Sequence, residues 1–202
     1  MLRRRSRESN SIHIYRMKYT GRECLQEFFA KKYLEELNYP DTTVIRIDHR
    51  MGKTYINSIQ TNILFPNYIL NYTKGLHTTE KSIDYCFKGT ITPSRQWIYQ
   101  FKENSILLNS NYGRNPAVKY TLDTEYYSML SKSKFTLCPL GDCPWSYRFF
   151  EAIMCLSIPV LEDTRDIFCK DYKFYTIDQP HIYDKEIALH NYDIFIKKNV
   201  LV

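Results

Sequence analysis

The chain has 202 residues, enough for one ordinary domain or for two small ones that share a cleft. Hydrophobic residues make up 44% and charged residues 25% of the sequence, which is the balance of a globular protein with a core and excludes a disordered chain. No apolar run approaches the roughly 20 residues of a membrane span, and the N-terminus lacks the apolar region of a signal peptide. From the sequence we therefore expect a cytoplasmic protein without a membrane span.

The net charge of +6 is partly concentrated at the N-terminus, in Arg3, Arg4, Arg5 and Arg7. Such a run is typical of a solvated, frayed terminus, and it is also compatible with contact to nucleic acid or an anionic membrane. No later stretch interleaves basic and aromatic residues as a nucleic-acid groove does. We therefore expect no nucleic-acid partner, and we expect the remaining positive charge to attract an anionic small molecule such as a nucleotide.

The six cysteines show neither a CxxC pair nor a histidine at zinc-ligand spacing. The acidic stretches at residues 123–125 and 163–166 do not make a convincing metal pair either. We therefore predict no metal site and no cofactor. Cys86 and Cys155 lie in apolar runs and are predicted to be buried free thiols.

Three elements are predicted in the first 50 residues. Residues 11–16 alternate in polarity and indicate a strand, residues 21–38 have the apolar spacing of an amphipathic helix, and the β-branched run at 43–47 indicates a buried strand. This succession is β-α-β, the unit of a parallel sheet. Residues 55–80 have no clear element, because Pro66 breaks any long one.

A second run of alternating elements begins near residue 83. It is predicted to contain strands at 84–90, 106–108, 134–137 and 158–161, and helices at 93–101, 124–131, 146–154, 164–168 and 180–198. We place a boundary near residue 80. Two small α/β units in tandem, each with parallel strands, imply a cleft between them.

The strongest chemical signal lies in residues 131–161. A buried strand ends there at a Pro/Gly loop, and a helix begins at about Ser146, a layout in which backbone N–H groups and the helix dipole face an anion. Arg148 lies in the first turn, where its guanidinium can bind a diphosphate bidentately. Glu151 lies on the same face and suits the hydroxyls of a ribose. The alternative is a structural Arg–Glu pair on an exposed helix, worth about 0.5 kcal/mol.

This segment resembles the C-terminal signature of the exostosin-like glycosyltransferases (family 47), which runs approximately S-K-F-x-L-x-P-x-G, then S-x-R-x-x-E-A, then G-C-I-P-V. Upstream, Phe87-Lys88-Gly89 with Arg95 downstream resembles the family's F-x-G…R strand and loop. The resemblance covers about residues 83–163. The residues of the segment that match are Ser133-Lys134-Phe135, Leu137, Pro139, Gly141, Ser146, Arg148, Glu151-Ala152 and Ile158-Pro159-Val160.

The chain departs from the signature in two places. Leu156-Ser157 stands where the family has Gly-Cys, and leucine does not readily take a positive φ. Either the turn there differs or the family's glycine is dispensable. Trp145 is an additional aromatic residue just ahead of the helix, and it suits either stacking on the donor base or capping of the core.

The resemblance implies an α/β fold of the GT-B type, with two Rossmann-like parallel-sheet domains and a reduced N-terminal domain. Residues 1–80 would form the acceptor side, 81–180 the donor-binding domain, and 181–202 a helix and tail that pack back on the N-terminal domain. The implied activity is inverting, metal-independent transfer of a sugar from a nucleotide-sugar donor, with a UDP-sugar favoured, to a glycan or glycoprotein acceptor. The predicted donor-binding residues are Gly89, Arg95, Lys134, Gly141, Trp145, Ser146, Arg148 and Glu151.

An inverting reaction calls for a general base on the acceptor side. Asp48 and His49 are the first candidates, because they follow the strand at 43–47, where α/β folds place their chemistry. Asp142, in the loop with Gly141, is the next candidate.

Two other functions compete with this interpretation. A non-catalytic nucleotide- or sugar-binding module that has lost a full acceptor domain is favoured by the short N-terminal half and the missing glycine. A basic nucleic-acid-binding protein is favoured only by the arginine run and the isoelectric point of 8.9. Turnover would distinguish the enzyme from the first, and a steep salt dependence of oligonucleotide binding would support the second.

Overall fold

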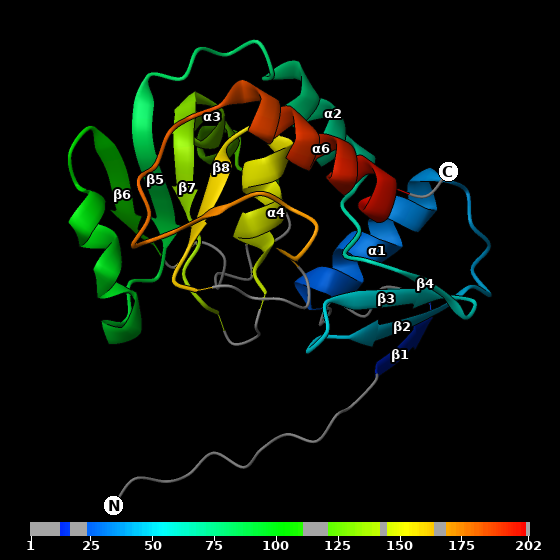
Figure 1. The fold of residues 1–202 in the computed structure, drawn as a ribbon. Coiled ribbons are helices and arrows are strands. Elements are labelled where there is room, and N and C mark those ends of the chain that lie inside the picture. The colour runs from blue at the N-terminus through cyan, green and yellow to red at the C-terminus, as the bar shows by residue number, and fades with distance from the viewer. Residues whose placement is uncertain (1–12, 17–23, 111–120, 142–144, 164–168, 201–202) are drawn as a thin grey trace, which may run out of the picture.

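The computed structural model describes residues 13–16, 24–110, 121–141, 145–163 and 169–200. Two sheets form its framework, one in each half of the chain (Figure 1). None of the helices within these ranges is long and apolar enough to cross a membrane. The predicted helix at 164–168 lies outside the described residues.

The sheet of the N-terminal half has four strands in the order β1-β2-β3-β4, and every neighbouring pair is antiparallel. The helix α1 (Leu25–Glu36) lies between β1 and β2 in the sequence and packs on one face of the sheet, where Ile45 and Ile47 meet Leu34. The strands are β1 (His13–Arg16), β2 (Val44–Asp48), β3 (Lys53–Ile56) and β4 (Ile59–Thr61).

This arrangement corrects the prediction of a parallel β-α-β unit, and with it the prediction of a second parallel-sheet domain. Strands β2, β3 and β4 follow each other through tight turns, which only antiparallel pairs allow. Gly52, Asn57 and Ser58 take positive φ in these turns. The hydrophobic pattern locates the strands but does not say in which direction they pair.

The sheet of the C-terminal half is parallel throughout, with the strand order β6-β5-β7-β8-β9. The prediction of a Rossmann-like α/β unit is confirmed for this half. Strand β9 was not predicted, and it has only two residues. The strands are β5 (Ile83–Gly89), β6 (Ser105–Asn109), β7 (Ser133–Leu137), β8 (Ile158–Leu161) and β9 (Tyr175–Thr176).

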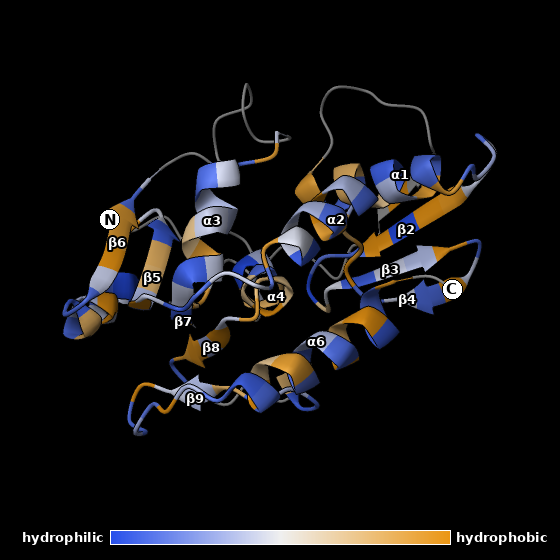
Figure 2. Ribbon diagram, turned by 90° about the horizontal axis from the view of Figure 1, so that it is seen from above, coloured by the Kyte–Doolittle hydropathy of each residue, from blue (hydrophilic) through white to orange (hydrophobic). Residues whose placement is uncertain are grey.

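Helices cover both faces of the parallel sheet (Figure 2). The first face is covered by α3 (Thr124–Lys132) and α4 (Tyr147–Met154), with α2 (Asn67–Gly75) beyond them. The other face is covered by the 3₁₀ helix η1 (Pro93–Phe101) and the first half of α6 (Lys185–Asn199). Cys86 and Cys155 are buried free thiols, as predicted.

The two halves share one hydrophobic core. It joins Phe29 of α1, Phe65 before α2, Phe149 of α4 and Phe195 of α6. The end of α6 also reaches the N-terminal half, where the Asn199 amide donates a 2.6 Å hydrogen bond to the Ile63 carbonyl. The boundary predicted near residue 80 falls between α2 and β5 and stays a prediction.

The turn after α4 resolves the question raised by the missing glycine. Leu156 takes a left-handed φ of 54°. The N–H of Leu156 bonds the Ile153 carbonyl and the N–H of Ser157 bonds the Ala152 carbonyl, which is the pattern of a Schellman motif. The backbone turn is thus one that glycine favours, and the glycine is dispensable. Left-handed strain of roughly 1–2 kcal/mol is offset by burial of the leucine side chain, which is 3% exposed.

Candidate functional site

A pocket of about 420 Å³ lies beside the carboxyl end of β5 and the start of α4. The carboxyl edge of a parallel sheet is where α/β folds bind ligands. Leu25 and Phe29 of α1 form one wall, so both halves of the chain contribute to the pocket. The predicted donor-binding residues that line it are Gly89, Arg95, Ser146, Arg148 and Glu151.

Arg148 is fixed at the end of β5. Its Nη2 donates a 2.8 Å hydrogen bond to the Lys88 carbonyl, and its guanidinium carbon lies 4.5 Å from the centre of the Phe87 ring. Gly89 makes this approach possible, because a Cβ at that position would lie 2.5 Å from Arg148 Nη2. The glycine is therefore needed for space rather than for backbone freedom.

Glu151 lies beside two tyrosines of α3. Tyr126 donates a 2.8 Å hydrogen bond to one carboxylate oxygen and Tyr127 a 3.3 Å bond to the other. Burial raises the pKa of Glu151 above its ordinary value, and the hydrogen bonds from the tyrosines and the charge of Arg148 act in the opposite direction.

The alternative of an exposed Arg–Glu pair does not describe this site. Arg148 and Glu151 are both partly buried, and the hydrogen bonds described above go to Lys88 and the two tyrosines. A ligand in the pocket would meet one fixed cation and one partly buried carboxylate.

The strand β5 is tied to α3 across the pocket. Lys88 forms a 2.5 Å ion pair with Asp123, and the other Asp123 oxygen accepts a 3.0 Å hydrogen bond from the N–H of Tyr126 as the cap of α3. Sequence reasoning missed this pair and both tyrosines. Lys88 could have been found from the sequence, because it lies inside the segment Phe87-Lys88-Gly89 that resembles the family.

Arg95 holds two loops together at the rim of the pocket. Its Nη1 donates to the Thr90 carbonyl at 2.9 Å, and its Nε and Nη2 donate to the Leu140 carbonyl at 3.1 and 3.0 Å. Gly141 lies next to it, because a Cβ there would be 4.0 Å from Arg95 Nη2. These contacts make Arg95 a positioning residue for the loop that contains Gly141.

The helix α4 points its N-terminus at the pocket. Ser146 and Tyr147, at its start, line the cavity. At its other end the carbonyl of Met154 contacts His77 Nε2 at 2.8 Å, and the Cys155 carbonyl accepts a 2.8 Å bond from Lys81 Nζ. Burial lowers the pKa of Lys81 to about 8. Basic groups thus bind the C-terminal carbonyls, and the positive end of the helix dipole faces the pocket.

Two predicted donor-binding residues lie away from this pocket. Lys134 forms a 2.6 Å ion pair with Asp84. Both residues stand near the starts of their strands, so Lys134 lies at the end of the sheet opposite the pocket. Trp145 is 8% exposed, packs on Gly52 and donates a 2.7 Å bond to the His49 carbonyl. Its position fits capping of the core rather than stacking on a base.

The candidate bases lie on the side of the N-terminal sheet. Asp48 accepts a 3.0 Å hydrogen bond from the N–H of Met51 and so stabilises a turn. His49 Nε2 lies 3.6 Å from Cys24 Sγ. Cys24 caps α1 and precedes Leu25, which lines the pocket. His49 is therefore near the pocket edge, and Asp142 lies outside the described residues.

Known proteins share this segment. Residues 70–168, which contain β5 to β8 and the pocket's charged residues, match the model of the exostosin GT47 domain. The resemblance to the exostosin-like glycosyltransferases of family 47 that the sequence predicts is thus confirmed for this segment.

Curated relatives are plant proteins. A stretch of 53 residues is 42% identical to "Probable beta-1,4-xylosyltransferase IRX10" of Arabidopsis thaliana. Over 53 residues the chain is also 40% identical to "Probable glucuronosyltransferase GUT1" of Oryza sativa subsp. japonica. Each match covers 25% of this chain and 13% of the plant protein, so the similarity spans a small part of the relatives' length.

Proposed function

We propose that this chain is a glycosyltransferase that binds a nucleotide-sugar donor in the pocket between α1, β5 and α4. The observation that carries the proposal is that Arg148 and Glu151, both on α4, line one pocket. The guanidinium of Arg148 is held by the Lys88 carbonyl, and the partly buried carboxylate of Glu151 is held by Tyr126. The plant relatives are named as xylosyl- and glucuronosyltransferases, which supports sugar transfer in polysaccharide synthesis. A UDP-sugar is the donor we favour.

In this proposal the phosphates lie between Arg148 and the N-terminus of α4. Positive charge fixed in advance at that point stabilises the diphosphate as it leaves the sugar. Glu151 accepts the ribose hydroxyls. An ionised carboxylate has about four lone-pair sites, and the two tyrosines occupy one on each oxygen, which leaves acceptor capacity for the ligand.

We further propose that the reaction inverts the sugar and that a base on the acceptor side activates a hydroxyl of a glycan or glycoprotein. His49 is the candidate nearest the pocket edge, through its contact with Cys24. Asp142 is the next candidate. Asp48 is better explained as a turn cap, because its carboxylate already binds the N–H of Met51.

Metal independence is part of the proposal, because Arg148 and the helix N-terminus supply the positive charge that a divalent ion supplies elsewhere. Transfer from a nucleotide sugar should keep its rate in excess EDTA. A rate that falls to background in EDTA and returns with Mn²⁺ or Mg²⁺ would contradict this part of the proposal.

The donor is tested by thermal unfolding in the presence of UDP, GDP, CMP and their sugar conjugates. A ligand at 100 times its Kd adds about 2.7 kcal/mol of stability, which is easily detected. We expect UDP and a UDP-sugar to stabilise most. No stabilisation by any nucleotide would contradict donor binding in this chain.

A second candidate is a binding module without turnover. It is favoured because, in the described part of the chain, neither Asp48 nor His49 lines the pocket. Release of nucleoside diphosphate from a bound nucleotide sugar, measured with a range of glycan acceptors, separates the two. Nucleotide binding with no release would support the module.

A further inference from the structure

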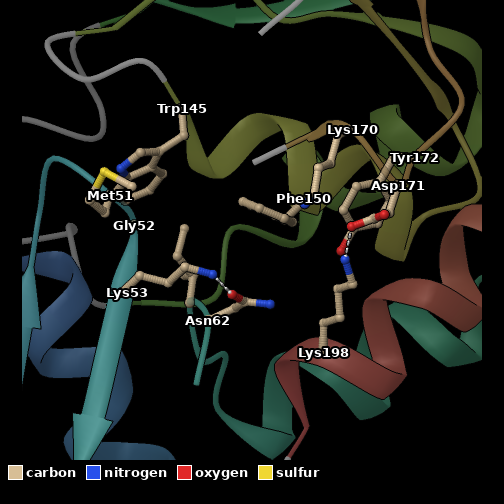
Figure 3. A pocket seen from close by; sticks show the side chains of 11 residues that line it. Met51, Gly52, Lys53, Asn62, Trp145, Phe150, Lys170, Asp171, Tyr172 and Lys198 are labelled. Carbon is tan, nitrogen blue, oxygen red and sulfur yellow. Dashed lines mark hydrogen bonds and ion pairs between the residues drawn. The ribbon is translucent and has the colours of Figure 1, made fainter. Parts of the chain in front are cut away.

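A second cavity, of about 160 Å³, lies between the two halves of the chain. The turn before β3, the segment before α2, residues 170–172 and the end of α6 form its wall (Figure 3). Trp145 and Phe150 also line it, whereas Ser146, Arg148 and Glu151 line the nucleotide pocket. The start of α4 thus separates the two cavities.

Positive charge gathers around this second cavity. Lys53, Lys170 and Lys198 line it, and Asp171 is the one acidic residue among its lining residues in the described chain. Lys198 forms an ion pair with Asp171, whereas Lys53 donates a hydrogen bond to the uncharged amide of Asn62 (Figure 3). Three ammonium groups against one carboxylate leave a surplus of positive charge.

The lysines also affect one another. Burial lowers the pKa of Lys53, and the charges of Lys198 and Lys170 lower it further. Like charges held this close repel each other, and an anion between them would remove that cost. A cavity with this charge favours an oxyanion as its ligand.

The rest of the wall is aromatic, with one unused polar group. Tyr172 is 6% exposed, and its buried hydroxyl has no hydrogen-bond partner in the described part of the chain. Lys198 lies over its ring, 5.8 Å from the ring centre. A buried hydroxyl without a partner is uncommon, and the Tyr172 that carries it is one of the lining residues of the cavity. Trp145 and Phe150 add apolar surface that suits the body of a small ring.

We propose that this cavity binds an acidic sugar unit of the glycan acceptor, with the carboxylate near Lys53 and Lys170 and the ring against Trp145 and Tyr172. The volume is below the roughly 300–1,000 Å³ of pockets for larger ligands, so one unit fits rather than several. The inference rests on the proposed function, which supplies a glycan, and it adds the class of that glycan.

The test titrates the full chain with glucuronate, glucose and inorganic sulfate while the indole N–H resonance of Trp145 is followed by NMR. Trp97, on η1, is the internal control. Glucuronate should shift the Trp145 signal saturably and leave Trp97 unchanged, and glucose, which lacks the carboxylate, should not. Lys53→Met or Lys170→Met should weaken glucuronate binding about tenfold or more. Lys173→Met and Lys197→Met, which remove neighbouring lysines outside the cavity, should not.

Three results would overturn the inference. One is the absence of a saturable shift with glucuronate, and another is sulfate binding as tightly as glucuronate, which would indicate a site for any free oxyanion. The third is a loss of UDP affinity in Lys53→Met, which would mean that the cavity is not separate from the nucleotide pocket. UDP binding to the unaltered chain is measured in parallel, so failure of the donor proposal is seen independently.

Discussion

The two sheets of this protein contribute differently to the candidate functional site. The parallel sheet places Gly89, Arg148 and Glu151 at one edge, where β5 ends and α4 begins. The antiparallel sheet carries the turn of Asp48 and the contact of His49 with Cys24, and neither Asp48 nor His49 is among the described residues that line this pocket. The difference follows from strand direction. Parallel strands end together and leave the N-termini of the following helices at one edge, whereas a meander alternates strand ends and turns.

The largest expected effect is at Gly89. A Cβ in Gly89→Ala would lie 2.5 Å from Arg148 Nη2, so the guanidinium must leave the Lys88 carbonyl. We expect calorimetry to give a Kd for UDP about tenfold to a hundredfold weaker than in the wild type. Gly75→Ala is the matched control, because nothing lies within 4 Å of a Cβ there. Equal UDP affinity in both variants would remove the argument that Gly89 makes room for Arg148.

A smaller effect is expected for Glu151→Gln. The amide keeps the shape but gives up the anionic acceptor, so UDP and uridine should both bind roughly tenfold more weakly. Ligand titration by calorimetry measures both. If only UDP affinity fell, Glu151 would be acting on the phosphates and not on the ribose.

The same variant tests the raised pKa of Glu151 through stability. Because the folded state holds this proton more tightly, the carboxyl contributes stability that is complete below its unfolded pKa, near 4.5, and is lost as pH rises through the folded value. As the pH rises from about 4.5, the free energy of unfolding of Glu151→Gln, measured in urea, should therefore increase relative to that of the wild type. A constant difference in unfolding free energy would contradict the raised pKa.

The smallest effect on nucleotide affinity is expected for substitutions beside the antiparallel sheet. His49→Ala should lower kcat while the Kd of UDP changes by less than about twofold, since His49 does not line the pocket in the described chain. Asp48→Asn is the control, because the amide oxygen can still cap the Met51 turn, and it should keep wild-type kcat. A kcat equal to wild type in His49→Ala would direct the search for the base to Asp142.

Much of the parallel half could be predicted from its sequence. Its strands and helices alternate, and the residues of the charged pair, Arg148 and Glu151, are neighbours on one helix. Contacts across long sequence separations could not be predicted, such as the bonds of Tyr126 and Tyr127 to Glu151. Lys134 lies at the end of its strand opposite the pocket, and the signature does not say which end of a strand a residue occupies.

The antiparallel half was predicted less well for a physical reason. Periodicity located β1, α1 and β2, but hydrophobic patterns are the same for parallel and antiparallel partners. Strands β3 and β4 are short and their turns contain Asn57 and Ser58, whose positive φ is a property of the folded turn. The missing glycine at Leu156 shows the opposite case, in which tertiary burial overrides the conformational preference of a residue.

The most direct test of the central claim, that the edge of the parallel sheet binds the donor phosphates, is calorimetry of Arg148→Ala with UDP and with uridine. Arg46→Ala is the matched control, because Arg46 also lies over an aromatic ring, that of Tyr55, but in the antiparallel sheet. Loss of one charge-assisted contact corresponds to roughly 1.5–3 kcal/mol, so Arg148→Ala should bind UDP about tenfold to a hundredfold more weakly and uridine unchanged. Unchanged UDP affinity in Arg148→Ala, or an equal loss in Arg46→Ala, would contradict the claim.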